Sequence, residues 1–344
     1  MRASLEPVLA ILGKPHVRFF VPVFQRVYAW TGPQCDQLLV DTLQAGRDGV
    51  AHFLGTMIYL PDTEQPDGAQ RGIAALGVID GQQRLTTLTL MLAALRDVLR
   101  EGSEDDKVLA VAIDREYLRA PDGGAKLTLS RADAATLDAI VAGEGEITMV
   151  GEPSRFLVQS FERFTARMRG EGFDREALWR GLKELRTVAV ELGPNDSPQQ
   201  VFESLNAKGR PLTTADLLRN TLLMTYGFEE QERLFALYWG PIERAFRRFS
   251  PDQDLYIDAA LHQWLVGAAP QIRAAKRDEL YGAFKEHLEE IKRRGVSLEE
   301  VLRSLNSSCL AFAADPASAL ARPHLDWVIA KPKGRISQRK LFGD

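Results

Sequence analysis

The sequence predicts a mixed α/β (α+β) core followed by a large all-helical C-terminal extension. Between residues 17 and 192, β-branched and aromatic runs alternate with segments whose apolar residues recur every three or four positions. From Ser197 onward, almost every segment has helical periodicity alone. A chain of 344 residues has room for two domains, or for one domain with such an extension.

The first strand candidate opens residues 17–30, where Pro22 indicates either an edge strand or a strand end followed by a loop. Apolar residues at helical spacing predict a helix over 34–43, and Thr31 is a candidate for its N-cap. Two further apolar runs, at 52–60 and 74–79, flank a polar loop and predict a β-hairpin.

A helix with one buried face follows the hairpin, because apolar residues from Leu85 to Leu99 repeat at three and four positions. The other candidates before residue 193 are a strand at 126–130, helices at 132–141, 154–170 and 174–186, and a strand at 187–192. Later helices are expected at 198–207, 214–226, 229–249, 254–267, 273–293 and 298–312. We therefore expect a first domain at 1–225, a helical domain at 226–330 and a basic, linker-like tail at 331–344.

Composition excludes several classes of protein. The chain is 45% hydrophobic and 26% charged, as in ordinary globular proteins, and no apolar run approaches the roughly 18 residues that cross a membrane. Residues 1–20 lack the layout of a signal peptide, so we expect a cytoplasmic protein without membrane contact. Cys35 and Cys309 have no partner at metal-ligand spacing and are expected to be free thiols. With a net charge of −4, contact with DNA must come from local basic patches.

The segment Asp80–Arg84 joins the second hairpin strand to the long helix. Free N–H groups of a first helical turn attract anions, Gly81 permits close approach, and Arg84 can grip two phosphate oxygens. The amides of Gln82 and Gln83 could donate hydrogen bonds, Asp80 could hold magnesium or orient a water, and the hydroxyls of Thr86 and Thr87 could add contacts. The alternative is structural: Asp80 caps the helix, Gly81 makes the turn and Arg84 is an exposed first-turn residue.

A second segment, residues 197–216, specifies helix, tight turn and helix. Ser197 with Gln200, and Thr213 with Asp216, have the spacing of helix N-caps, and Gly209 and Pro211 end the first helix. The turn brings together one amide and two cations that could reach phosphates: Asn206, Lys208 and Arg210. Two alternatives are a purely structural turn and a helix-turn-helix that reads a DNA groove, although the second helix is rich in leucine and acidic at its start.

The polar and aromatic residues after Pro22 are a third candidate site. Gln25, Arg26, Tyr28 and Trp30 could stack a base or surround a modified nucleotide. Alternatively, the aromatic residues belong to the core. The sequence has no Walker A phosphate loop, no G-x-S-x-G elbow, no H-E-x-x-H pair and no G-x-G-x-x-G fingerprint, so the usual mononucleotide fold is disfavoured.

Four motifs, in this order, closely resemble the N-terminal domain of the GmrSD family, which includes the SspE-type effectors of phosphorothioate-based defence. They occupy residues 21–30, 52–56, 78–88 and 202–212, and the Asp80-Gly81-Gln82-Gln83-Arg84 segment is the most specific of them. The resemblance covers about residues 17–225. It implies a ParB/sulfiredoxin-like mixed-sheet core that binds and hydrolyses a nucleoside triphosphate, GTP or another, with Mg²⁺.

The resemblance also implies roles for individual residues. The catalytic candidates are Asp80, Gln83 and Arg84, with Asp80 as the metal ligand. The nucleotide-binding candidates are Gly81, Gln82, Gln25, Arg26, Asn206, Lys208 and Arg210. The candidates for sensing a DNA modification, either a phosphorothioate or a glucosylated base, are Tyr28, Trp30 and Pro22. The expected partners are modified double-stranded DNA and a nuclease domain or subunit, with homo-oligomerisation an open possibility.

The sequence departs from the family at its C-terminal end. Complete members usually carry a His-Asn-His nuclease domain with an E-H-I-x-P-like stretch. Here Glu286-His287-Leu288-Glu289 has no such proline and lies in an amphipathic helix. We therefore expect a fragment, or a separate subunit, whose nuclease lies elsewhere. Two alternatives stay open: a non-hydrolytic DNA-binding or regulatory module, and a ParB-like nuclease in its own right.

Overall fold

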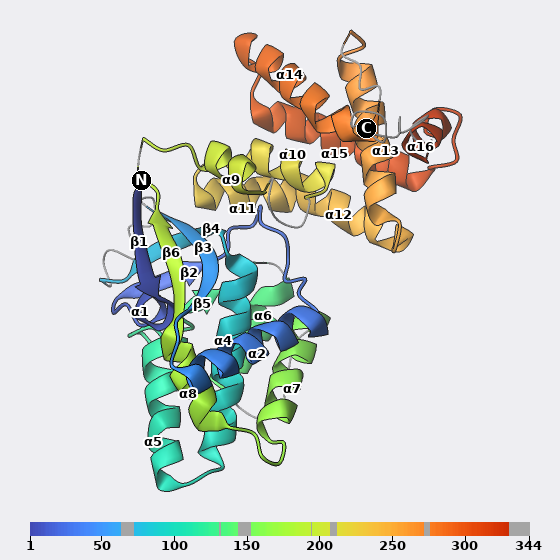
Figure 1. Ribbon diagram of the computed structural model, residues 1–344. Helices are drawn as coiled ribbons and strands as arrows, with labels where there is room; N and C mark the ends of the chain where they lie inside the picture. The colour runs from blue at the N-terminus through green and yellow to red at the C-terminus, as the bar shows by residue number, and fades with distance from the viewer. Residues whose placement is uncertain are drawn as a thin grey trace, which may run out of the picture. The chain divides into compact units, whose positions relative to one another are not determined.

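The computed structural model describes residues 1–62, 72–130, 132–143, 153–193, 195–206, 212–271 and 276–329 (Figure 1). The chain divides into two compact units, Met1–Ser204 and Leu205–Asp344. The first unit contains a sheet covered by helices, and the described part of the second unit is helical. The predicted mixed α/β class with a helical C-terminal region is therefore confirmed.

Six strands form one mixed sheet, in the order β1-β6-β3-β4-β2-β5. Their bounds are β1 Arg2–Pro7, β2 Val17–Phe20, β3 His52–Pro61, β4 Ala74–Asp80, β5 Leu127–Thr128 and β6 Leu185–Glu191. The pairs β1/β6 and β3/β4 are antiparallel, whereas β3/β6, β2/β4 and β2/β5 are parallel. The hairpin predicted from the two apolar runs is thus confirmed as β3 and β4.

Strand β2 lies inside the sheet, between β4 and β5, so the edge-strand alternative for this segment is wrong. The other alternative is confirmed, because β2 ends at Phe20 and Pro22 follows in the loop. Phe19 is completely buried and its ring meets Tyr59 edge-on, with centroids 6.0 Å apart. Hydrophobic burial, rather than an exposed sheet edge, therefore explains the aromatic run.

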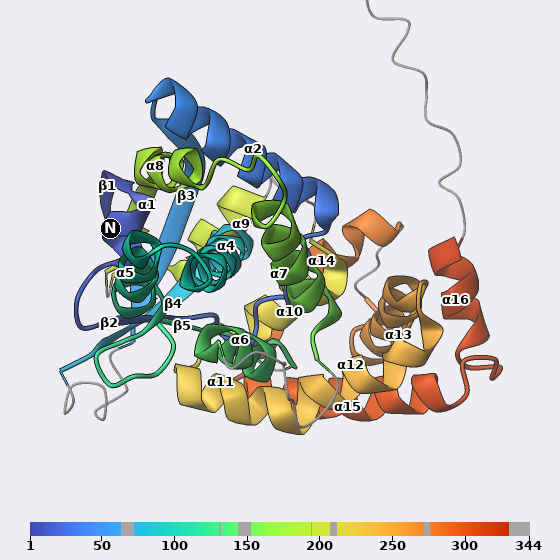
Figure 2. The same ribbon diagram turned by 90° about the horizontal axis from the view of Figure 1, so that it is seen from below.

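Helix α4 of the first unit spans Gln82–Arg100. The other helices are α1 Val8–Leu12, α2 Gly32–Asp48, α5 Glu104–Ile113, the π-helical turn η1 Asp114–Leu118, α6 Ala132–Ala142, α7 Arg155–Met168 and α8 Arg175–Glu184. Helix α4 packs against α5, η1, α6 and α7. Figure 2, in which α4 is seen nearly end-on, shows α5 and α7 on opposite sides of it. Helix α9, Pro198–Asn206, follows β6.

Helix α4 is buried almost all round, not on one face as its periodicity predicts. All its residues except Arg84, Asp97 and Arg100 are buried. The polar positions tolerate burial because their hydroxyls bond within the helix: Thr87 Oγ1 donates to the Gln83 carbonyl at 2.7 Å, and Thr89 Oγ1 to the Leu85 carbonyl at 3.0 Å. Periodicity alone misses such self-satisfied polar residues.

Helices α2 and α8 approach each other through two glycines. A Cβ on Gly181 would overlap the carbonyl oxygen of Thr42, and a Cβ on Gly46 would overlap that of Ala177. Each helix therefore presents its backbone to the other without an intervening side chain. Neither helix can accept even a methyl group at this crossing unless the two backbones move apart.

We expect Gly181→Ala to lower the free energy of unfolding by about 2 kcal/mol or more, since overpacking a tight contact typically costs about 1–3 kcal/mol. Denaturant unfolding of the purified chain measures this effect. The matched control is Gly282→Ala, because Gly282 is helical and no atom lies within 4 Å of the point that an added Cβ would occupy. That control should be neutral or slightly stabilising. Equal stability of the two variants would contradict the close-packing argument.

The second unit is built from helices in its described residues. They are α10 Thr214–Leu223, α11 Phe228–Leu234, η2 Phe235–Trp239, α12 Gly240–Phe246, η3 Arg247–Phe249, α13 Gln253–Ala268, η4 Arg277–Glu279, α14 Leu280–Arg293, α15 Leu298–Ala314 and α16 Arg322–Ile329. The single helix predicted at 229–249 is continuous but changes its winding at the π-helical turn η2 and the 3₁₀ turn η3. Among the described residues, no helix is long and apolar enough to cross a membrane.

Candidate functional site

The predicted phosphate-binding segment lies where β4 gives way to α4. Strand β4 ends at Asp80, and Gly81 turns the chain with φ 88°, a conformation that L side chains rarely adopt. A Cβ on Gly81 would also lie 3.3 Å from both the Thr56 carbonyl oxygen and the Met57 Cα. Gly81 is therefore required both by its backbone conformation and by the close passage of β3.

The start of α4 leaves N–H donors without acceptors. No side chain caps the helix, and the first bond of the helix runs from the Leu85 N–H to the Gly81 carbonyl at 2.9 Å. Gln82 and Gln83 are each 8% exposed, and none of the described residues accepts a hydrogen bond from their backbone N–H groups. Donors without a protein acceptor at the positive end of a long helix favour an anion.

Arg84 is held by the backbone of β3. Its guanidinium donates to the carbonyls of Leu54 and Thr56, the latter at 2.6 Å, and lies 3.3 Å from Asp80 Oδ2. Gly55 has φ 89°, and a Cβ there would lie 2.5 Å from Arg84 Nη1. Burial lowers the pKa of Arg84, and the neighbouring Asp80 carboxylate opposes this shift.

These carbonyls are free to accept because β4 ends at Asp80, opposite Ile58, and does not extend along residues 54–56 of β3. The register between β3 and β6 shifts at a bulge between Phe53 and Thr56. The carbonyl of Gly55, within the bulge, accepts from Thr187 Oγ1 at 2.7 Å, and Arg84 takes the carbonyls on either side. In this structure Arg84 is thus a positioning residue that fixes β3 beside the start of α4.

The glutamine side chains fasten the loop after β2 to the same place. Gln25 Nε2 donates to the Ile79 carbonyl at 2.8 Å, and its Oε1 accepts from Gln82 Nε2 at 3.1 Å. Gln83 Oε1 accepts from the Ala29 N–H at 2.8 Å. Gln25 therefore lies next to the Asp80–Arg84 segment, as predicted. The glutamine side-chain amides bond to the protein, so the donors left for a ligand are the backbone N–H groups of Gln82 and Gln83.

Asp80 keeps the freedom that a metal ligand needs. Its side chain is 30% exposed, and among the described residues only Arg84 is bonded to it. The described residues contain no group of three or more His, Cys, Asp or Glu that could hold a metal. Mg²⁺ is commonly bound by one or two carboxylates together with substrate phosphates, and a single accessible carboxylate beside an anion site fits that mode.

The three residues predicted to sense modified DNA differ in their exposure to solvent. Tyr28 is 3% exposed, and its hydroxyl lies 2.9 Å from Thr87 Oγ1 and 3.3 Å from Ser160 Oγ. Burial raises its pKa. Pro22 is buried as well, so neither residue offers a surface to DNA in this structure, because both pack into the core.

Trp30 differs from Tyr28, because it is half-buried and lines a cavity of about 660 Å³ between the start of α2 and α7. Phe156, Arg163 and Arg167 line the same cavity. These three residues were missed from the sequence, where they read only as one side of an amphipathic helix. Both arginines are exposed, although Arg163 Nη1 lies 2.9 Å from Asp36 Oδ2, and aromatic rings beside exposed arginines can stack a base.

The second predicted segment is only partly described. Asn206 ends α9, whereas Lys208 and Arg210 lie outside the described residues. Arg26 is half-buried in the loop after β2. The capping box of Thr213 and Asp216 is formed as predicted.

Helix α10 bears on the alternative that this segment reads a DNA groove. None of its residues, Thr214–Leu223, is exposed. A recognition helix needs an exposed face, so the structure gives this alternative no support.

Comparison with known proteins agrees with the motif order. The model of the family described as GmrSD restriction endonuclease, N-terminal domain, matches residues 8–223. No curated protein matches the chain. The match includes β2, β3, β4 and the start of α4, and it covers more than half of the chain. The chain therefore belongs to the GmrSD restriction endonuclease N-terminal domain family.

Proposed function

We propose that this chain is the nucleotide-hydrolysing and DNA-sensing part of a modification-dependent restriction system that acts against phage. Its family places it in a restriction context. The observation that carries the proposal is the pair of N–H groups at the start of α4 that have no acceptor among the described residues, next to the accessible carboxylate of Asp80. Together they suit the phosphates of a nucleoside triphosphate.

In the proposed mechanism, the N–H groups of Gln82 and Gln83 hold phosphate oxygens, and Asp80 is the residue that would hold Mg²⁺. The metal would supply charge neutralisation on the phosphates. Arg84 adds positive charge and keeps β3 against the site through the Leu54 and Thr56 carbonyls. Water attacks the terminal phosphorus, and the bond to the bridging oxygen breaks.

Gln83 offers a physical route between the nucleotide site and the DNA. Its backbone N–H is one of the free donors, while its side-chain oxygen accepts from the Ala29 N–H, next to Trp30. Movement of Trp30 on binding a modified nucleotide would therefore reach the first turn of α4 through one hydrogen bond. We propose Trp30, with Arg163 and Arg167, as the sensing surface.

The proposed partners are modified double-stranded DNA, GTP or another nucleoside triphosphate, and a nuclease domain or subunit. Phosphate release by the purified chain with Mg²⁺ tests the proposal. GTP and ATP should each be tried without DNA, with unmodified DNA, with phosphorothioate DNA and with DNA carrying glucosylated bases. We expect turnover of at least one nucleotide, with stimulation by one of the modified DNAs and not by unmodified DNA.

Two outcomes would favour the alternatives. Salt-sensitive DNA binding without turnover of any nucleotide would indicate a non-hydrolytic binding module. This alternative has one observation in its favour, since the side chains of Gln82, Gln83 and Arg84 are all engaged with the protein. Metal-dependent nicking of plasmid by the chain alone would indicate a nuclease.

A further inference from the structure

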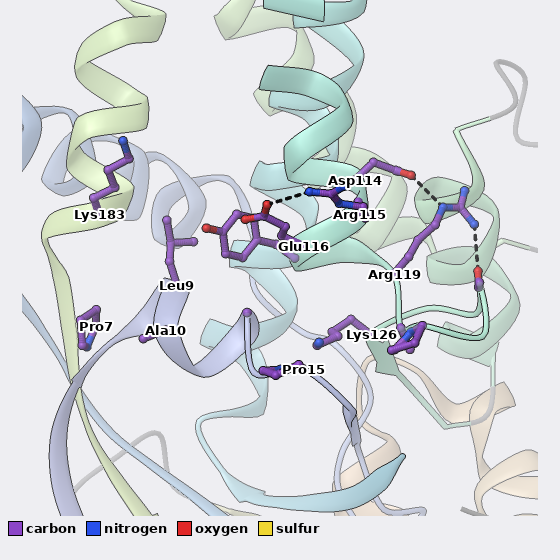
Figure 3. A pocket seen from close by; sticks show the side chains of 15 residues that line it. Pro7, Leu9, Ala10, Pro15, Asp114, Arg115, Glu116, Arg119, Lys126 and Lys183 are labelled. Carbon is purple, nitrogen blue, oxygen red and sulfur yellow. Dashed lines mark hydrogen bonds and ion pairs between the residues drawn. The ribbon is translucent and has the colours of Figure 1, made fainter. Parts of the chain in front are cut away.

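A cavity of about 910 Å³ lies in the first unit, away from the predicted motif (Figure 3). Residues from α1, from η1 and from the loop before β5 line it, and Lys183 of α8 closes one side. This volume is in the range of pockets that hold small organic ligands, about 300–1,000 Å³.

The cavity lies at the end of the sheet where β2, β4 and β5 begin, and Asp80 lies at the other end, where β4 stops. Strands β2, β4 and β5 are mutually parallel, and Val17 at the start of β2 pairs with Ala74 at the start of β4. Pro15 and Lys126 line the cavity just before β2 and β5 begin, whereas Asp80 ends β4. At about 3.3 Å per residue, the length of β4 separates the two places by about 20 Å.

Lys126 is a buried cation without an acidic partner. It is 3% exposed, and its ammonium donates to the Lys14 carbonyl at 2.6 Å. None of the described acidic residues pairs with it, and burial lowers its pKa with no carboxylate opposing the shift. An ammonium has three donors, of which the Lys14 carbonyl takes one, and a buried charge without a partner is costly, so an anion at this point would be stabilising.

The two acids that line the cavity are already paired with arginines of the same lining. Asp114 lies 2.9 Å from Arg119 Nε, and Glu116 lies 3.3 Å from Arg115 Nη2. Figure 3 marks both pairs, and no such line reaches Lys126. The acids therefore leave the charge of Lys126 available to a ligand.

The rest of the lining indicates that the ligand has an apolar part. Pro7, Leu9, Ala10, Pro15 and the ring of Tyr117 supply apolar surface, and the only other lysine in the lining is exposed Lys183. We infer that this cavity binds a small organic anion, whose acidic group pairs with Lys126 and whose apolar body packs against these walls. The site is separate from the proposed nucleotide site and does not depend on it.

The test uses a matched pair of fluorescent probes, 8-anilinonaphthalene-1-sulfonate and its uncharged analogue N-phenyl-1-naphthylamine. The wild-type chain should bind one equivalent of the sulfonate more tightly than the neutral analogue. Lys126→Met keeps the buried stem and removes the charge. It should weaken sulfonate binding roughly 10-fold or more, as expected for loss of a charged hydrogen bond, and leave binding of the neutral analogue unchanged.

Lys107→Met is the control, because Lys107 is an exposed lysine of α5, paired with Glu104. It should bind both probes like the wild type. Thermal unfolding separates a ligand site from a structural tie: Lys126→Met should keep or raise the midpoint, since it removes an uncompensated charge. Equal affinity of wild type and Lys126→Met for the sulfonate would overturn the inference, as would equal affinity of the wild type for both probes.

Discussion

Asp80→Asn should fold like the wild type and lose nucleotide turnover by about 100-fold or more, the usual scale when a group that stabilises transition-state charge is removed. The amide keeps the size of the carboxylate but cannot offer a full negative charge to Mg²⁺. The side chain is partly exposed, and among the described residues only Arg84 is bonded to it, at 3.3 Å. The substitution should therefore change the stability of the fold little and reduce nucleotide hydrolysis strongly. Phosphate release at saturating nucleotide measures the effect.

A second carboxylate–arginine pair provides the matched control. Glu176 and Arg180 are also four residues apart, here within α8, with 2.6 Å between Glu176 Oε1 and Arg180 Nη1. Glu176→Gln should leave turnover unchanged. If Asp80→Asn hydrolyses nucleotide like this control, Asp80 is not the metal ligand. If the wild type shows no turnover at all, the proposed function itself fails.

Arg84→Ala is a weaker test of chemistry, because it removes more than one interaction. The guanidinium satisfies the carbonyls of Leu54 and Thr56, which lie beyond the end of β4 and have no partner in that strand. Without it, β3 and Gly55 would lose their position beside α4. Loss of activity in that variant would not separate a catalytic role from a positioning role.

Local signals in the sequence predicted much of the fold. Thr31 and Thr213, both predicted as N-caps from nearby residues alone, are the N-cap residues of α2 and α10. The hairpin of β3 and β4 follows from two adjacent apolar runs. The positive φ of Gly81 follows from a strand, a glycine and a helix in sequence.

Features that depend on distant partners were missed. Strand β1 was not predicted: its six-residue sequence is short, although it alternates polar and apolar residues, and the strand is largely exposed and placed by its pairing with β6, far away in the sequence. Tyr28 has the residue type of a ligand-binding position, yet its place is fixed by Thr87 and Ser160, far away in the sequence. The cavity at Lys126 is lined by residues from Pro7 to Lys183, and no local sequence motif indicates it.

Arg96 is the clearest case of a buried charged residue with a structural role that the sequence did not predict. It is completely buried in α4, with Nε 2.8 Å from Asp97 and Nη1 2.7 Å from Asp114. It also donates to the carbonyls of Val141 at 2.6 Å and Ile140 at 3.0 Å, in the last turn of α6. One side chain thus joins α4, η1 and the C-terminal end of α6.

Arg96→Met should lower the free energy of unfolding by about 3–5 kcal/mol, the usual cost of removing one partner from a buried ion pair. The change leaves Asp114 and two helix-end carbonyls short of a buried donor, although Met fills much of the volume. Because the chain has two units, amide hydrogen exchange of α4 and α6 measures the effect where it arises. Protection in both helices should fall together.

The neighbouring Arg100 tests whether burial, and not charge alone, sets this cost. Its side chain is 42% exposed, and it shares the same two acids, with Nη1 3.3 Å from Asp97 and Nη2 3.9 Å from Asp114. Water can replace it, so Arg100→Met should cost at most about 1 kcal/mol. Equal losses of unfolding free energy in the two variants would mean that Asp97 and Asp114 need only a nearby positive charge, whether buried or exposed. A large loss only in Arg96→Met would show that α6 is held by a desolvated guanidinium for which water cannot substitute.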